Sequence, residues 1–338
     1  MPSIIEQIAT ELNISSASVS RALNDRPGVG QDLRERILQR ARELNYTSSL
    51  IARGLATSQT FNLGFFVREK PNLSTQTDPF YGEILHGAEQ ALAETDFHVA
   101  VGTLTNTIVN SPGDFRFVRE RRIDGMILAG PDIPNSFVLA MVQSGLPVVL
   151  VDNKLDYSPI NCVNSDDETG AYLAARHLIE LGHQQIGIMA GPEGWASNDR
   201  RVRGYLRALQ EAGLTAPILH MDHTTIDSGK SAYERLMRDY PNITGICAVN
   251  DAMAIGTIRA AQANNLHIPH DLSVIGFDDI EWASLNTPSL TTISIPKRQM
   301  GKEAAHRLLA LLNDPTTYPI EVMVAVQLVQ RESTAERR

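Results

Sequence analysis

The stretch IIEQIATELNISSASVSRALN, residues 4–24, predicts two short helices joined by a tight turn. Its apolar residues recur three and four positions apart, which is the spacing of one helix face. Asn13 tolerates the left-handed backbone that the turn requires, and Ser15 is a good N-cap for the second helix. Ala9 is small enough for the helices to cross, and Val19 fills the core between them. The spacing therefore predicts a helix-turn-helix, whose second helix would lie in the major groove of DNA.

The rest of the first 60 residues is also expected to be helical. Residues 24–28 break the chain with turn-forming Asn, Asp, Pro and Gly. A third helix follows, and its apolar face is formed by Leu33, Ile37, Leu38, Ala41 and Leu44. A short fourth helix, starting at residue 49, ends in polar residues near residue 57. The alternative interpretation is a plain helical subdomain that packs on the rest of the protein.

After Phe61 the pattern changes, because short apolar runs alternate with amphipathic helical stretches. The runs cover residues 63–67, 99–104, 126–129, 148–151, 186–189, 218–220, 246–249 and 274–277, with a last strand-like run at 322–329. Such alternation is typical of βαβ units around parallel sheets. A stretch of roughly 270 residues is larger than one such sheet usually needs, so two lobes are expected. Ligands of these sheets bind beyond the carboxyl ends of the strands.

Composition and charge limit the class of protein. With 43% hydrophobic residues, the chain buries a core and is not disordered. Its two cysteines, Cys162 and Cys247, indicate neither a disulfide framework nor a metal cluster, and they fit a reducing cytosol. Neither a membrane span nor a signal peptide is recognised, so a cytoplasmic location is expected. The net charge is −9, but the first 60 residues are slightly basic and all their cations are arginines, which suits nucleic acid.

The residues of the predicted helix-turn-helix follow a known signature. Residues 14–24, ISSASVSRALN, resemble the V-S-x-x-T-V-S-R-x-L-N signature of the lac repressor family, and residues 50–55, LIARGL, resemble its hinge, A-L-A-R-x-L. Later blocks resemble that family in the same order: HLIELGH at 177–183, NDAMAIG at 250–256, SVIGFDD at 273–279 and PSLTTI at 288–293. Because the resemblance covers nearly the whole chain, the protein is identified as a member of the lac repressor and galactose repressor family.

The resemblance implies a chain in three parts. Residues 1–47 would form an all-α helix-turn-helix DNA-binding domain, and residues 48–60 would form a hinge helix and linker. Residues 61–338 would form a ligand-binding and dimerisation domain, an α/β fold with two lobes and parallel sheets that is similar to the periplasmic sugar-binding proteins. The chain shows no added leucine heptad of the kind that a tetramer would use, so a homodimer is expected.

The same resemblance implies which residues of the second helix touch operator DNA. Arg21 would reach a guanine edge, while Ser16 and Ala17 occupy positions that vary with the operator sequence. Ala17 has no donor and offers only apolar contact, for example to a thymine methyl group. The hydroxyl groups that suit phosphates are those of Ser15, Ser18 and Ser20. For each of these serines, a helix cap or a solvated surface group is the alternative.

The hinge resemblance adds a second contact with double-stranded DNA. The residues concerned are Ala52, Arg53 and Leu55. In the family, the leucine wedges into the minor groove at the operator centre, and such wedges bend the duplex. Two residues depart from the family pattern, because Ser48 replaces the usual Pro at the hinge start and Gln59 replaces the usual Arg near its end.

The resemblance also implies an effector pocket. Its residues would be Phe80, Tyr81, Asp152, Trp195, Ser197, Arg201, Asn250 and Asp278. Asn250 and Asp278 follow strand-like runs, so an amide and a carboxylate would converge with the Arg201 guanidinium on a polyhydroxylated ligand. Trp195 would stack on a sugar face or serve as ordinary packing. Asp152 ends the run at 148–151.

The sequence therefore predicts a transcription regulator, a repressor, that binds a near-palindromic operator as a homodimer and responds to a sugar-like effector. A transport receptor of the same fold would need a secretion signal and no helix-turn-helix. An enzyme would need a catalytic constellation, and none is recognised: the pattern at residues 229–231 lacks the upstream glycine of a phosphate-binding loop, and adjacent Asp278 and Asp279 usually point apart. No cofactor or metal is expected, and His177 and His183 lack a third ligand.

Overall fold

The chain folds into two compact units, residues 1–61 and residues 62–338. The structure, a computed structural model, describes residues 3–23, 26–44, 46, 59–70, 76–155 and 158–337. The expected hinge helix, with Ala52, Arg53 and Leu55, lies outside these residues. No helix within the described ranges is both long enough and apolar enough to cross a membrane.

The described residues of the N-terminal unit form three helices around a small core. They are α1 (Ile4–Leu12), α2 (Ser16–Leu23) and α3 (Gln31–Glu43). Ser3 caps α1 through its hydroxyl group, and Glu6 returns a bond to the Ser3 amide. The fully buried side chains of Ile8, Val19 and Ile37 meet where the helices cross. One core residue from each helix therefore holds the three together.

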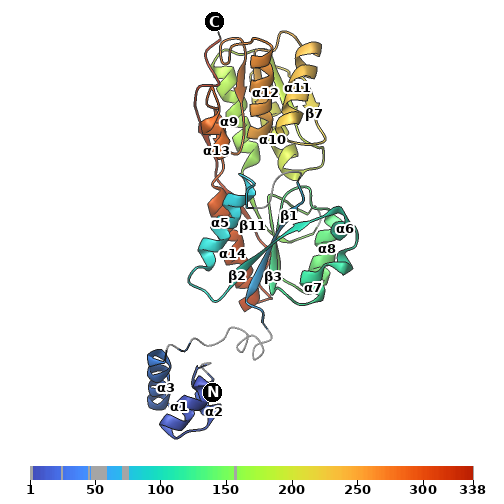
Figure 1. Ribbon diagram of the computed structural model, residues 1–338. Helices are drawn as coiled ribbons and strands as arrows, with labels where there is room; N and C mark the ends of the chain where they lie inside the picture. Colours follow the sequence, from blue (N-terminus) through green and yellow to red (C-terminus); the bar gives the residue numbers. More distant parts are fainter. Residues whose placement is uncertain are drawn as a thin grey trace. The chain divides into compact units, whose positions relative to one another are not determined.

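The first lobe of the larger unit is a six-stranded parallel sheet. Its strands, in spatial order, are β11 (Glu321–Val324), β5 (Asn161–Ser165), β4 (Val148–Val151), β3 (Gly125–Ala129), β1 (Asn62–Arg68) and β2 (His98–Leu104). Helices α5 (Tyr81–Leu92) and α14 (Lys297–Asn313) cover one face (Figure 1). The other face carries α6 (Asn106–Asn110), a 3-10 turn (Pro112–Asp114), α7 (Arg116–Arg119) and α8 (Asn135–Gln143).

Glycines bring α5 and α14 into unusually close contact. A Cβ atom at Gly87 would collide with the Arg298 carbonyl group, and one at Gly301 would collide with the Ile84 carbonyl group. Only glycine permits this approach of the two backbones. The pair is also joined at its surface by an ion pair between Arg298 and Glu83, whose Nε and Oε2 atoms lie 2.6 Å apart. The two helices are therefore held together both by backbone packing and by an ion pair.

The second lobe repeats the parallel architecture on a smaller scale. Its strands, in spatial order, are β7 (Ile218–His220), β6 (Ile186–Ala190), β8 (Gly245–Ala248) and β9 (Ser273–Ile275). Its helices are α9 (Asp167–Glu180), α10 (Ala196–Glu211), α11 (Ile226–Asp239), α12 (Asp251–Ala263) and α13 (Glu281–Leu285). The α9–α10 pair and the α11–α12 pair pack on opposite sides of this sheet, because they share separate core clusters with alternate residues of its strands.

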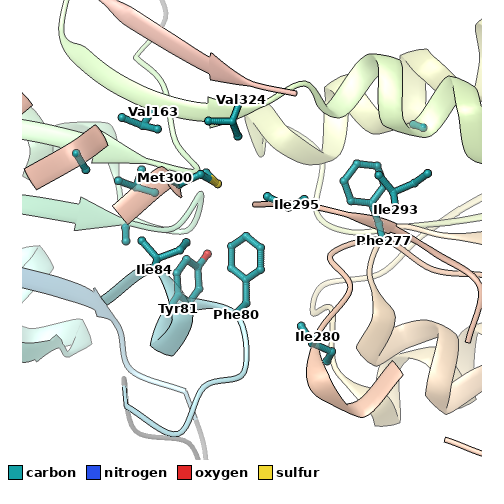
Figure 2. Close-up of a cluster of buried hydrophobic side chains, with 14 of the residues drawn as sticks. Phe80, Tyr81, Ile84, Val163, Phe277, Ile280, Ile293, Ile295, Met300 and Val324 are labelled. Atoms are coloured by element: carbon teal, nitrogen blue, oxygen red, sulfur yellow. The ribbon is translucent and has the colours of Figure 1, made fainter. Parts of the chain in front are cut away.

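The chain crosses between the lobes three times. It passes from β5 to α9, from β10 (Thr292–Ser294) to α14, and from β11 to β12 (Gln327–Val329). Strands β10 and β12 pair antiparallel beside the crossings. One apolar cluster continues through this region: Figure 2 shows Phe80 and Tyr81 on one side, Phe277 and Ile280 on the other, and Ile295 between them.

The expected α/β fold with two lobes and parallel sheets is confirmed, and each of the eight apolar runs forms a strand. The ninth run, at 322–329, differs from the others because it forms two strands instead of one. It forms β11 in the first lobe and β12 in a different sheet, because the chain crosses between the lobes at residues 325–326. The run at 274–277 ends early as a strand, at Ile275, just before the turn that carries Asp278.

Candidate functional site

The turn of the helix-turn-helix has the predicted conformation. Asn13 adopts the left-handed region with φ 54° and ψ 49°. The Ile14 amide donates to the Ala9 carbonyl oxygen at 2.9 Å, which closes the end of α1. The Ser15 hydroxyl accepts from the Ser18 amide at 3.1 Å and so caps α2. These local bonds set the angle at which α2 leaves α1.

One side of α2 is left open to a partner. Val19 and Ala22 are buried against α1 and α3, whereas Ser16, Ala17 and Arg21 are exposed. Ser15 is exposed as well, while Ser18 and Ser20 are half-buried. The predicted base-reading positions therefore share the solvent face of α2. This is the face that a recognition helix presents to a major groove.

The eight predicted effector residues line one cavity of about 110 Å³ between the lobes. From the first lobe come Phe80, Tyr81 and Asp152, and from the second come Trp195, Ser197, Arg201, Asn250 and Asp278. The sequence did not single out six further lining residues, which are Lys70, Pro131, Asp132, Asn198, Thr224 and Val249. Most of them follow strand ends. Asp132 follows β3 in the way that Asp152 follows β4, and this position was the signal available in the sequence.

Arg201 is the anchor of the second-lobe half. Its Nε donates to Asp167 Oδ1 at 2.9 Å, and its Nη1 donates to the Val249 carbonyl oxygen at 2.7 Å. The guanidinium carbon lies 3.9 Å from the centre of the Phe277 ring. Burial alone would lower the pKa of Arg201, but the charges of Asp278, Asp167 and Asp152 raise it, so the group stays a cation. Stacking on Phe277 and hydrogen bonds to two acceptors fix the guanidinium plane in the cavity wall.

Asp278 sits on a strained turn at the end of β9. Its φ is 108°, and the next residue, Asp279, has φ 52°. A non-glycine residue in such a conformation costs energy and is held only where its surroundings dictate it. The side chain of Asp279 turns away to Arg331, at 2.6 Å, so the adjacent carboxylates do not form a pair in the cavity. The expectation that the two carboxylates point apart is thus confirmed.

Two buried groups hold this turn. Asp251 accepts from the Ile280 amide at 2.9 Å and from the Thr292 hydroxyl at 2.5 Å. Lys297, at the first turn of α14, donates from Nζ to the carbonyl oxygens of Asp278 at 2.6 Å and Asp279 at 2.9 Å. Because α14 belongs to the other lobe, Lys297 ties the Asp278 turn to the helix pair α5–α14.

Burial and nearby cations have opposite effects on the pKa of the Asp278 carboxylate. Burial raises its pKa to about 6, although the charges of Arg201 and Lys297 act in the opposite direction. Its Oδ1 lies 3.1 Å from Arg201 Nη1 but accepts no well-aligned hydrogen bond from any described residue. A buried carboxylate oxygen without an aligned donor is one that a ligand hydroxyl group would satisfy.

In the first-lobe half, a buried tyrosine faces a buried carboxyl group. The Tyr81 hydroxyl donates to Asp152 Oδ2 at 3.0 Å. Burial raises the pKa of Asp152 to about 7, partly offset by the charge of Arg201. Burial and the negative charge of Asp152 also raise the pKa of Tyr81 well above its usual value. Near neutral pH this carboxyl group can therefore donate or accept a proton.

The other candidates from the sequence have structural roles. His177 bonds the Thr334 hydroxyl at 2.9 Å, and His183 bonds the Thr244 hydroxyl at 2.9 Å. Gly229, in the sequence that resembles a phosphate-binding loop, lies inside α11 and abuts the Met253 backbone of α12. In the part of the chain that the structure describes, no three His, Cys, Asp or Glu side chains are grouped to hold a metal.

Both units match known families. Residues 4–49 match the family described as "Bacterial regulatory proteins, lacI family". Residues 61–332 match "Periplasmic binding proteins and sugar binding domain of LacI family". The chain belongs to the lacI family. This confirms the family that was predicted from the resemblance of residues 14–24 to the lac repressor signature.

Relatives and solved structures agree with the family assignment. The chain is 33% identical over 334 residues to a probable HTH-type transcriptional repressor, ExuR, from Bacillus subtilis (strain 168), covering 97% of each chain. It is similar to the lac repressor dimer bound to operator and the anti-inducer ONPF, with TM-score 0.81 and 26% identity over 99% of this chain and 100% of that one. A ribose-bound lacI family regulator from Enterococcus faecium gives TM-score 0.71 and 27% identity over 82% of this chain and 100% of that one.

This lacI family member is a DNA-binding transcriptional repressor whose larger unit is of the family's sugar-binding type. Its relatives are transcriptional repressors, so the expectation that it is not an enzyme is confirmed. The transport-receptor alternative is overturned by the match of residues 4–49 to the regulatory family.

Proposed function

We propose that the cavity between the lobes is the effector site of this repressor, and that its eight predicted residues bind the effector. The observation that carries the proposal is their convergence: side chains from eight positions between Phe80 and Asp278 line one cavity. The cavity lies beyond the carboxyl ends of parallel strands, where ligands of such sheets bind. The solved relative that contains ribose supports a sugar as the class of effector.

The chemistry of the lining suits a ligand with many hydroxyl groups. Asp152 and Asp278 accept hydrogen bonds, Arg201 and Asn250 donate them, and Trp195 offers an aromatic face. Asn250 is itself fixed, because its Oδ1 accepts from the Met253 amide at 2.9 Å and caps α12. A sugar needs directional partners of both kinds, and a rigid wall supplies them at low entropic cost.

On the DNA side, Arg21 reads a guanine edge and Ser16 and Ala17 read the neighbouring bases, from the exposed face of α2. The operator is a near-palindrome because the dimer is two-fold symmetric. The hinge residues Ala52, Arg53 and Leu55 contact the minor groove. The protein acts in the cytoplasm, where operator DNA is found.

The switch works through closure of the two lobes on the effector. An isolated hinge of about nine residues is too short to stay helical in water, so its folding is coupled to operator binding. Lobe closure changes the spacing of the paired hinges and so biases that folding. By linkage, an effector that weakens operator binding binds the operator complex less tightly, and a corepressor does the opposite.

The test begins with operator selection from a random duplex library with the full-length protein. Gel shifts with and without pentoses and hexoses then measure the response, and calorimetry measures the affinity. Asp278→Asn should abolish sugar binding while operator affinity without sugar is kept. Asp279→Asn is the matched control, because that neighbouring carboxylate bonds Arg331 outside the cavity lining. Undiminished sugar affinity in Asp278→Asn removes Asp278 from the site.

A second variant tests the hinge. Leu55→Ala should keep sugar affinity, because the residue precedes the two-lobed unit. It should lose most specific operator affinity and DNA bending, since the wedge that unstacks the central step is gone. Unchanged bending would show that Leu55 is only a linker residue.

A further inference from the structure

The charges in the cavity wall are unbalanced. Three carboxyl groups line the cavity, those of Asp132, Asp152 and Asp278, against two cations, Lys70 and Arg201. From this imbalance we infer that the site selects against anionic sugars, so that the effector carries neither a carboxylate nor a phosphate group. The inference rests on the proposed effector site and specifies the class of sugar that it takes.

Both cations already have anionic partners. Lys70 Nζ lies 2.8 Å from Asp78 Oδ2 and 4.5 Å from the centre of the Tyr81 ring. Asp78 is itself fixed, because its Oδ1 accepts from the amides of Phe80 and Tyr81 at the start of α5. Arg201 is shared between Asp167 and Asp278. An anionic ligand would have to compete with these carboxylates for each cation.

Two of the carboxyl groups have no such cation. Among the residues that the structure describes, no ion pair within 4.0 Å includes Asp132 or Asp152. Tyr81 donates to Asp152, but a hydroxyl group is neutral and leaves the negative charge in place. Burial raises the pKa of both carboxyl groups because it removes water from their ionised forms, and the nearest cations, Lys70 for Asp132 and Arg201 for Asp152, offset this only in part.

The repulsion is large enough to decide specificity. At roughly 7 Å and an effective dielectric of about 20, each like charge weakens binding of an anion about 50-fold. A neutral sugar avoids this cost, and its hydroxyl groups donate to carboxylate oxygens that accept no well-aligned hydrogen bond from the described residues. One such oxygen is Asp278 Oδ1, which is buried. The same oxygens that repel a carboxylate therefore favour a hydroxyl group.

The experiment compares matched sugars at pH 8, where Asp152 is ionised. Calorimetry and thermal shift on the full-length protein use galactose, galacturonate and galactose 6-phosphate, the corresponding glucose series, and ribose with ribose 5-phosphate. The neutral member of a series should bind at least 50-fold more tightly than its anionic counterparts. An anionic sugar that binds as tightly as its neutral counterpart overturns the inference but leaves the effector site intact. If no sugar of any charge binds, the proposed sugar effector fails and the inference fails with it.

Charge-removing variants test the cause. Asp132→Asn and Asp152→Asn should each shift the ratio of neutral to anionic affinity toward the anion, by about tenfold or more. Glu234→Gln, which removes a charge from an exposed position on α11, should leave the ratio unchanged. Using the ratio separates charge from packing, because lost packing would weaken both ligands alike. A ratio that neither cavity variant changes contradicts the inference.

Discussion

The carboxyl group of Asp152 makes the stability of this protein depend on pH in a predictable direction. Its pKa is raised by burial from 3.8 to about 7. Between these values the folded protein holds a proton that the unfolded chain has lost, so stability falls as pH rises from about 4 to 7. The shift is about 3 pKa units, and at about 1.4 kcal/mol per unit the loss amounts to about 4 kcal/mol at most. Charges facing this group from other elements are Arg201, Asp167 and Asp278.

The replacement Asp152→Asn removes the titration and keeps an oxygen for the Tyr81 hydroxyl. The free energy of unfolding of the variant should be close to that of the wild type at pH 4.5 and clearly higher than that of the wild type at pH 8. At roughly 2–4 °C per kcal/mol for a domain of this size, its melting temperature should gain on the order of 10 °C across that range. Calorimetric scans at several pH values measure this gain.

Glu234→Gln is the control, because it removes an exposed carboxyl group and should show no pH-dependent gain. A constant difference between Asp152→Asn and wild type at all pH values would refute the reasoning. It would mean that the folded protein does not retain the proton on Asp152.

Three other predictions follow from contacts elsewhere. Gly87→Ala should lower the free energy of unfolding by about 3 kcal/mol or more in chemical denaturation, because the new methyl group meets the Arg298 carbonyl group, whereas Gly113→Ala meets open space and should be nearly neutral. Lys297→Met should destabilise the larger unit by about 1–3 kcal/mol for each buried carbonyl group that loses its donor, and a denaturation midpoint equal to wild type would contradict this. Arg21→Ala should cost about 1–3 kcal/mol in specific operator binding and much less in non-specific binding, so equal losses in gel shifts would mark Arg21 as a phosphate contact only.

Much of the site was predictable because the carboxyl ends of parallel strands lie at the same edge of a sheet. Asp152 was found by its place at the end of a strand-like run, and Asn250 and Asp278 by theirs together with the family resemblance. The same positional rule would have found Asp132, which follows β3, and Lys70, which follows β1. They were missed because single charged residues in loops resemble solvated surface groups until the strand order is known.

The sequence by itself determined the elements whose causes are local. The helix-turn-helix follows from Asn13 in its left-handed turn, Ser15 as a cap and apolar residues at helical spacing, and these act within about a dozen residues. The strand-like runs follow from short-range patterning in the same way. Such features need no knowledge of what packs against them.

Only the tertiary structure decided which strands pair and which charged side chains meet when the residues lie far apart in the chain. The run at 322–329 has one continuous pattern, yet it divides between two sheets because each half pairs with a strand far away in the chain. Arg201 is neutralised by Asp167 and Asp278, which leaves Asp152 without a cation of its own. Pairing and burial depend on which surfaces meet after folding, and local spacing carries no information about charges that meet across such contacts. The charge balance of the cavity is therefore a property of the folded lobes rather than of any one segment.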